Sequence, residues 1–139
     1  STADKSGFNA LHYAVRGGNI AGVNLLISRG ADINSRSDEG ITPLFECVSF
    51  AQRNILRSLL IEQGAEVNAR THKGQTALHQ AVITRQIQMV KDLLDSGARY
   101  SIRDHTGRTP ADYAVLEGNM EIVRIIQSAW PKPTSTPAE

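Results

Sequence analysis

The chain has 139 residues, of which 40% are apolar, 5% aromatic and 21% charged, and its formal net charge at pH 7 is +1. This length allows one ordinary domain. The near-zero charge gives no indication of nucleic acid, a membrane or an acidic substrate as a partner, and we expect no nucleic-acid partner. No run of about 18 apolar residues occurs, so we expect no membrane insertion. The one cysteine, Cys47, excludes an internal disulfide and is compatible with a reducing compartment, so we expect an intracellular location, cytoplasmic or nuclear.

Four glycines mark an internal repeat. Gly7, Gly40, Gly74 and Gly107 follow one another at steps of 33, 34 and 33 residues. Each opens a similar phrase: GFNALHYAV, GITPLFECV, GQTALHQAV and GRTPADYAV. A second phrase recurs at the same period, as in LLISRGADIN and LLIEQGAEVN. Two phrases in fixed order at one period indicate a single structural unit used repeatedly, and a thin core of Leu, Ile, Val and Ala suits a stack of such units.

Each unit is predicted to begin with a short helix. An N-cap residue precedes this helix in each unit. Its side-chain oxygen can accept a hydrogen bond from an unpaired backbone N–H of the first turn. The predicted N-caps are Asn9, Thr42, Thr76 and Thr109. Pro43 and Pro110 follow two of them, at the first helical position, where proline loses no hydrogen bond.

A second helix is predicted after a tight turn in every unit, because apolar residues recur at i, i+3 and i+4. The predicted second helices are Ile20–Ser28, Ile55–Glu62, Ile87–Asp95 and Met120–Gln127. A glycine just past the helix end favours termination, and Gly30, Gly64 and Gly97 stand there in the first three units. An extended loop then leads into the next unit.

The second unit holds one residue more than its neighbours. Gly40 to Gly64 spans 24 steps, whereas Gly7 to Gly30 spans 23. The Gly-Asn or Gly-His pair expected between the helices is missing from residues 49–54. We therefore place the insertion there and expect a longer first helix or a bulged turn between the helices.

The repeated phrases resemble the ankyrin repeat, over roughly residues 4–130. The resemblance implies an all-α ankyrin-repeat solenoid of four helix-turn-helix units with β-hairpin-type loops, forming one domain over residues 1–130. The repeats would cover about residues 4–36, 37–70, 71–103 and 104–130, with the first helices and loop tips lining a concave side. Residues 131–139 contain three prolines and no apolar pattern, so we expect a disordered tail.

Several residues are of types that occur in catalytic or metal-binding sites. His12 and His79 occupy the same repeat position, which favours a structural role bridging backbone groups of neighbouring loops. Ser49 lies near Cys47 and Glu46, but no histidine with an orienting partner accompanies it, as nucleophilic catalysis would require. We expect no enzyme activity, no metal and no cofactor.

Basic residues recur just before each turn. Arg36, Arg70 and Arg103 hold equivalent positions, and in a stacked array they would form a row close to Lys73 and Arg108. Such a row could bind an acidic or phosphorylated peptide through bidentate guanidinium contacts. The alternative is that these arginines pair with turn carboxylates such as Asp38 or Asp104.

Residues that vary between units are the better candidates for a binding site, because residues needed for the fold recur. Several variable positions are apolar where solvent is expected, and an apolar strip with a basic rim is typical of a protein-binding surface. The alternative is that some of them pack under adjacent loops. The complete candidate set is Phe8, Arg16, Arg36, Ile41, Phe50, Arg70, Lys73, Ile83, Arg103, Arg108 and Leu116.

Asn34 and Asn68 stand eight residues after Leu26 and Leu60. This spacing resembles the context that an asparaginyl hydroxylase accepts in ankyrin repeats, so both are candidates for hydroxylation. The alternative is that their side chains only hold the loop backbone.

The function implied is that of a protein–protein interaction module that acts as a monomer and binds a protein or peptide on the concave face. The alternative is a regulatory or targeting domain of a larger enzyme, such as an Arf GTPase-activating protein. The sequence begins at Ser1 rather than Met, so we expect it to be part of a longer protein.

Overall fold

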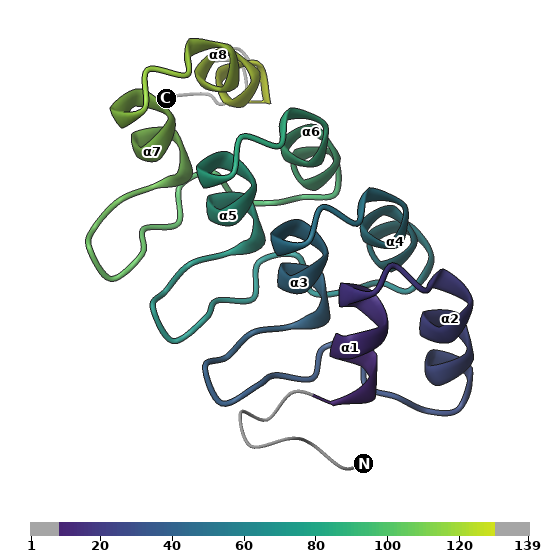
Figure 1. Ribbon diagram of the computed structural model, residues 1–139. Coiled ribbons are helices and arrows are strands. Elements are labelled where there is room, and N and C mark those ends of the chain that lie inside the picture. Colours follow the sequence, from purple (N-terminus) through teal and green to yellow (C-terminus); the bar gives the residue numbers. More distant parts are fainter. Residues whose placement is uncertain (1–8, 130–139) are drawn as a thin grey trace, which may run out of the picture.

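A computed structural model describes residues 9–129, within which four helix pairs are stacked (Figure 1). The helices are α1 Ala10–Arg16, α2 Ile20–Ser28, α3 Pro43–Ser49, α4 Arg53–Arg57 continued by the π-helical turn η1 Ser58–Glu62, α5 Ala77–Ile83, α6 Ile87–Asp95, α7 Pro110–Leu116 and α8 Met120–Ala129. No β-strand occurs in this described part of the chain. The expected all-α solenoid is confirmed.

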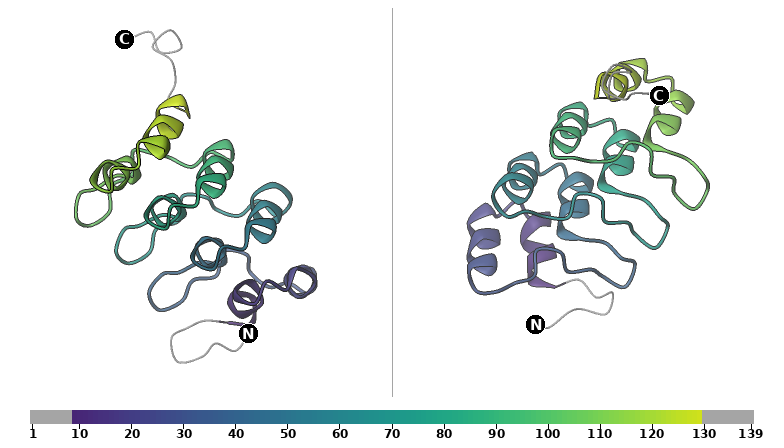
Figure 2. Two further views of the ribbon diagram at one scale, coloured as in Figure 1. Left: turned by 45° about the horizontal axis from the view of Figure 1, so that its top comes forward. Right: turned by 180° about the vertical axis from the view of Figure 1, so that it is seen from behind.

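The helices form two layers (Figures 1 and 2). The first helices of the pairs, α1, α3, α5 and α7, pack side by side, and the second helices lie behind them. Long loops project from the first helices on the other side. We call the side formed by the first helices and the loops the inner face, and the side formed by the second helices the outer face.

The loops between repeats are closed as hairpins and joined to one another. In repeat two the Ser37 N–H donates to the carbonyl of Ile41 (2.9 Å). Repeats three and four close their loops in the same way. The His72 N–H donates to the Glu39 carbonyl of the preceding loop at 2.9 Å, and the His105 N–H donates to that of Lys73 at 3.0 Å. Backbone bonds therefore hold the loops in one row.

The first helix of each pair starts where the sequence predicts. The Thr42, Thr76 and Thr109 hydroxyl oxygens each accept from a backbone N–H three residues on, at 3.2 to 3.3 Å. The Asn9 Oδ1 accepts from two N–H groups of the first turn. These bonds satisfy donors that an uncapped helix leaves unpaired. The glycines predicted to end the second helices have φ between +67° and +96°, a conformation that favours glycine.

The predicted place of the extra residue is wrong. Residues 50–52 form a turn of the same length as residues 17–19, and α3 has seven residues, as α1 has. Ala51 adopts φ +56° where Gly18 has φ +72°, so the turn keeps its geometry without the expected glycine. The extra residue lies instead in the second helix, which begins at Arg53, before the predicted Ile55, and widens at η1, where the Gln63 N–H donates to the Ser58 carbonyl (3.2 Å). A helix absorbs one added residue by forming such a π-turn.

The core runs along the whole stack between the two layers. It is built mainly of Leu, Ile, Val and Ala, and its side chains include Leu11, Leu44, Leu59, Leu78 and Leu93, all at most 2% exposed. Cys47 is part of this core, and burial, reinforced by the neighbouring Glu46, raises the pKa of its thiol well above the usual value. The thiol therefore stays protonated and serves as a small apolar group.

A candidate protein-binding surface

A groove of 210 Å³ opens on the inner face between repeats two and three. Its apolar lining is Ile41 and Phe45, both half-buried. Glu39 and Lys73 stand exposed at the loop tips beside it, and Gln80 lines it from α5. The structure thus brings two predicted site residues, Ile41 and Lys73, to one groove. An apolar floor with polar groups at its edge can hold an apolar side chain and orient the chain that carries it.

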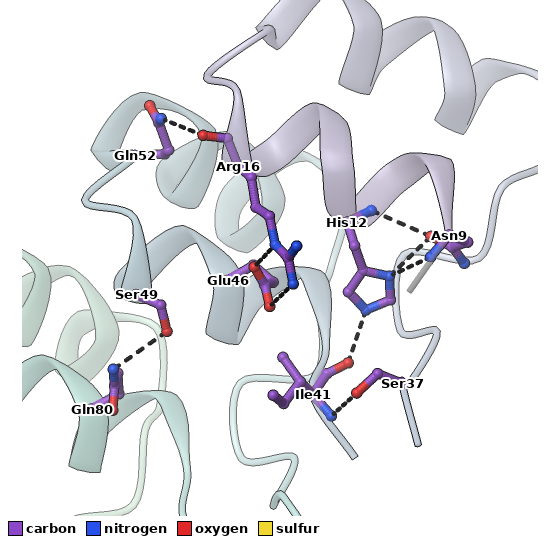
Figure 3. Close-up of polar contacts among 9 residues, drawn as sticks. All are labelled: Asn9, His12, Arg16, Ser37, Ile41, Glu46, Ser49, Gln52 and Gln80. Atoms are coloured by element: carbon purple, nitrogen blue, oxygen red, sulfur yellow. Dashed lines mark hydrogen bonds and ion pairs between the residues drawn. The ribbon is translucent and has the colours of Figure 1, made fainter. Parts of the chain in front are cut away.

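A second inner-face cluster is centred on Arg16 at the end of α1 (Figure 3). The Arg16 Nε lies 2.7 Å from Glu46 Oε1 on α3, and the Glu46 residue is only 3% exposed. The guanidinium carbon lies 5.1 Å from the centre of the Tyr13 ring and 5.4 Å from that of Phe50, distances typical of cation–π contacts. Both aromatic rings are 47% exposed. The cluster therefore offers solvent an aromatic surface around a fixed cation.

Arg16 and Phe50 were predicted from the sequence, but Tyr13 and Glu46 were not. Their repeat position could have been found, because residues 13, 46, 80 and 113 are equivalent and carry Tyr, Glu, Gln and Tyr. Because the residue type at this position varies between repeats, the position is a candidate for partner binding.

The position of Arg16 recurs along the inner helices as Ser49, Ile83 and Leu116. Ser49 accepts a hydrogen bond from Gln80 (3.3 Å), Ile83 is half-buried, and Leu116 is 63% exposed. The apolar character of this row therefore increases toward α7. Phe8 lies outside the described residues.

The arginine row is present, but its described hydrogen bonds are made to the backbone. Arg36 donates to the carbonyl of Arg70, and Arg70 donates through Nη2 to that of Arg103 (2.8 Å). Arg103 donates to the Gly107 carbonyl of its own loop (2.9 Å). Within residues 9–129 no ion pair joins any of the three to Asp38 or Asp104. The row thus ties successive loops together, and a role in peptide binding stays a prediction.

Asp104 organises the inner face of repeat four. Its carboxylate accepts from the Tyr113 hydroxyl, from Thr106 and from the Arg108 N–H. Burial by itself would raise the pKa of Asp104, but these hydrogen bonds outweigh it and hold that pKa well below its usual value. The guanidinium of Arg108, a predicted site residue, lies 5.7 Å from the centre of the Tyr113 ring, so Arg108 stacks on this network.

His12 and His79 play the structural role that their repetition favours. The His79 Nδ1 accepts from the Thr76 N–H (3.1 Å), so its Nε2 donates to the carbonyl of Arg108 in the next repeat (3.0 Å). His12 joins Asn9 to the Ile41 carbonyl (2.8 Å) in the same manner (Figure 3). Each ring is fully buried and links two repeats.

Burial lowers the pKa of His79, and its described environment keeps the ring neutral. The unfolded chain therefore binds a proton at this residue before the folded chain does, once the pH falls below about 6.5. We expect the free energy of unfolding to fall between pH 7 and pH 5, by at most about 1.4 kcal/mol per pH unit for this group. The depressed pKa of Asp104 adds a further loss only below about pH 4. Urea denaturation at several pH values measures both losses in the free energy of unfolding, the one from His79 and the one from Asp104. A His79→Gln variant with an unchanged slope between pH 7 and 5 would contradict the assignment.

Asn34 and Asn68 also join repeats. The Asn34 Oδ1 accepts from the Glu66 N–H (2.9 Å), and the Asn68 Oδ1 accepts from the Arg99 N–H (2.8 Å). The Asn68 amide nitrogen also donates to the carbonyl of Gly97 (3.2 Å). These contacts support the structural alternative, and hydroxylation of either residue stays a prediction.

The stacked helix pairs and hairpin loops define a helical repeat protein, and comparison with known proteins identifies its kind. A family model described as ankyrin repeats (3 copies) matches residues 1–71 and 44–134. The chain therefore belongs to the ankyrin-repeat family, whose members generally mediate protein–protein interactions. Within residues 9–129 no helix is long and apolar enough to cross a bilayer.

Curated relatives match shorter segments. The chain is 51% identical over 45 residues to mouse ankyrin repeat and MYND domain-containing protein 1, covering 32% of this chain and 5% of that protein. It is 44% identical over 59 residues to human protein phosphatase 1 regulatory subunit 27, covering 42% of this chain and 38% of that protein. The mouse counterpart of that subunit is 45% identical over 58 residues, with the same two shares. The matches thus span well under half the length of each relative.

Proposed function

We propose that this chain is a non-catalytic module that binds a partner protein or peptide on its inner face, the side expected to be concave. The observation that carries the proposal is the groove between repeats two and three, with its Ile41 and Phe45 lining. The Arg16 cluster supports it, because it keeps Phe50 half exposed beside a cation held by Glu46.

The mechanism is presentation of a preorganised surface. Arg16 is held by an ion pair and two aromatic rings, and the loops are joined by backbone bonds. Side chains that are already ordered lose little entropy when a partner binds. The groove would take an apolar anchor, and the loop arginines with Lys73 would form a basic rim that favours partners carrying carboxylate or phosphate groups.

The test begins with affinity purification and mass spectrometry to identify a partner, followed by titration of that partner against variants. Three variants are expected to weaken binding by about 2 kcal/mol each, or about 30-fold, because apolar anchors dominate interface energies. They are Ile41→Ala in the groove, and Phe50→Ala and Ile83→Ala at the ends of inner helices α3 and α5. Lys91→Ala and Arg124→Ala, exposed on outer helices α6 and α8, serve as matched controls and are expected to leave affinity unchanged. If Lys91→Ala and Arg124→Ala weaken binding and the inner-face variants do not, the site lies on the outer face.

A second candidate is regulation of an enzyme through this binding, because two of the relatives are named regulatory subunits of protein phosphatase 1. The same inner face would then hold the enzyme. Titration of purified protein phosphatase 1 catalytic subunit distinguishes this candidate: saturable binding lost in Phe50→Ala supports it, and no binding refutes it. A domain of an Arf GTPase-activating protein remains an alternative that would use the same surface.

A further inference from the structure

The outer face carries an irregularity in repeat two. The extra residue of this repeat widens the second helix into the π-turn η1, and π-turns are frequent at functional sites. Leu59 of this turn is fully buried, whereas Ile61 is 71% exposed, more than any other large apolar side chain among residues 9–129. The exposed Ile61 side chain adds apolar surface to the outer face beside η1.

Ile61 forms a ridge between two grooves on the outer face. The larger groove, of 390 Å³, lies between α2 and η1, with Ile20 and Asn24 opposite Ile61. The smaller, of 220 Å³, lies between η1 and α6, with Asp95 on its far side. Ile20 is 41% exposed, so the larger groove has an apolar side chain on each wall.

Carboxylates outnumber basic groups around this ridge. Glu62 lines the larger groove and Asp95 the smaller, and both residues are exposed. Within residues 9–129 neither forms an ion pair. Asp92 also lines the smaller groove, but Arg53 holds it at 2.9 Å. Arg57 is the basic residue that lines both grooves. Glu62 accepts a hydrogen bond from the Ser58 hydroxyl (3.1 Å) and keeps its charge. Two carboxylates that form no ion pair, beside one arginine, favour a cationic partner.

We propose that the outer face around η1 is a second protein-binding surface, whose partner is a segment with an apolar side chain flanked by Lys or Arg. The apolar side chain lies between Ile20 and Ile61 in the larger groove. The basic side chains lie against Glu62 and Asp95. The surface is on the opposite layer from the inner face (Figure 2), so it is independent of the function proposed above.

The probe is a phage-displayed library of short random peptides selected on the full chain, with selected peptides then synthesised and titrated by fluorescence anisotropy. We expect a class of peptides in which Leu, Ile, Met or Phe is flanked by Lys or Arg. For this class Ile61→Ser and Asp95→Lys each weaken binding about tenfold, and the inner-face change Phe50→Ala leaves it unchanged. The proposal is overturned if no selected peptide is sensitive to Ile61→Ser and Asp95→Lys. It is also overturned if the sensitive peptides contain no basic residues.

Two further measurements separate binding from folding. Thermal melting of Ile61→Ser and Asp95→Lys should match the parent chain, because both positions are exposed and exposed substitutions change stability by at most about 0.5 kcal/mol. If Ile61→Ser lowers the melting temperature, the peptide binding of Asp95→Lys, on α6, becomes the test of the proposal. Deletion of Ile61 restores a second helix of ordinary length and is expected to give a folded chain that no longer binds the basic peptides. Retained binding by that deletion variant counts against the proposal.

Discussion

Replacing Leu78 by Ala is expected to destabilise the fold by about 2 to 5 kcal/mol, the range measured for leucines deleted from closed cores. Leu78 is fully buried on α5, which packs against both α3 and α7. Neither neighbour can move in to fill the cavity without losing its own contacts, so little of the cost is recovered. Urea denaturation followed by circular dichroism measures the change.

Leu116→Ala is the matched control for this prediction. Leu116 lies on the equivalent inner helix α7 but is 63% exposed, so the same substitution should cost less than about 0.5 kcal/mol. Equal losses in the two variants would mean that the inner helices are not stacked as described.

Replacing Arg16 by Ala is expected to cost about 3 kcal/mol, because it leaves the carboxylate of Glu46 buried without its cation. Glu46 is 3% exposed, whereas the Arg16 side chain is 27% exposed. The two partners therefore differ: Glu46→Gln should cost only about 1 kcal/mol, since the arginine it leaves can reach water. The double variant should be more stable than Arg16→Ala alone.

Chemical denaturation of the four proteins of this double-mutant cycle gives the coupling directly. The exposed pair of Arg85 with Glu117, whose side chains are 65% and 32% exposed, is the comparison, and Arg85→Ala should cost less than about 0.5 kcal/mol. Simple additivity of Arg16→Ala and Glu46→Gln would show that the pair is not coupled. A coupled pair would also explain why Phe50 and Tyr13 are held around a fixed cation on the inner face.

Most of the fold could be predicted from the sequence because the repeat is encoded locally. Thr42, Thr76 and Thr109 act through hydrogen bonds to backbone groups three residues away. A glycine such as Gly97 ends a helix through its own φ. These interactions need no knowledge of the rest of the chain, and four copies of the same pattern reinforce one another.

The extra residue of repeat two shows where local reasoning failed. The spacing of Gly40 and Gly64 shows that the residue is present, but the missing glycine in the turn between the helices wrongly predicts that the residue lies there. Tertiary packing keeps the extra residue out of this turn, because residues 50–52 must hold the geometry that aligns α3 with α4. The second helix could absorb the residue at η1, where Leu59 stays in the core and Ile61 turns to solvent.

The sequence by itself determined the repeat, the starts of the first helices, and the class of function that a stacked array serves. Only the tertiary structure decided which variable residues meet. Arg16, Glu46 and Phe50 come from two repeats, and their ion pair and ring contacts depend on the distance between stacked helices. The same holds for Arg36 and Arg70, which bind carbonyls of the next loop. The physical reason is that backbone geometry is set within a few residues, whereas side-chain partnership across repeats is set by packing.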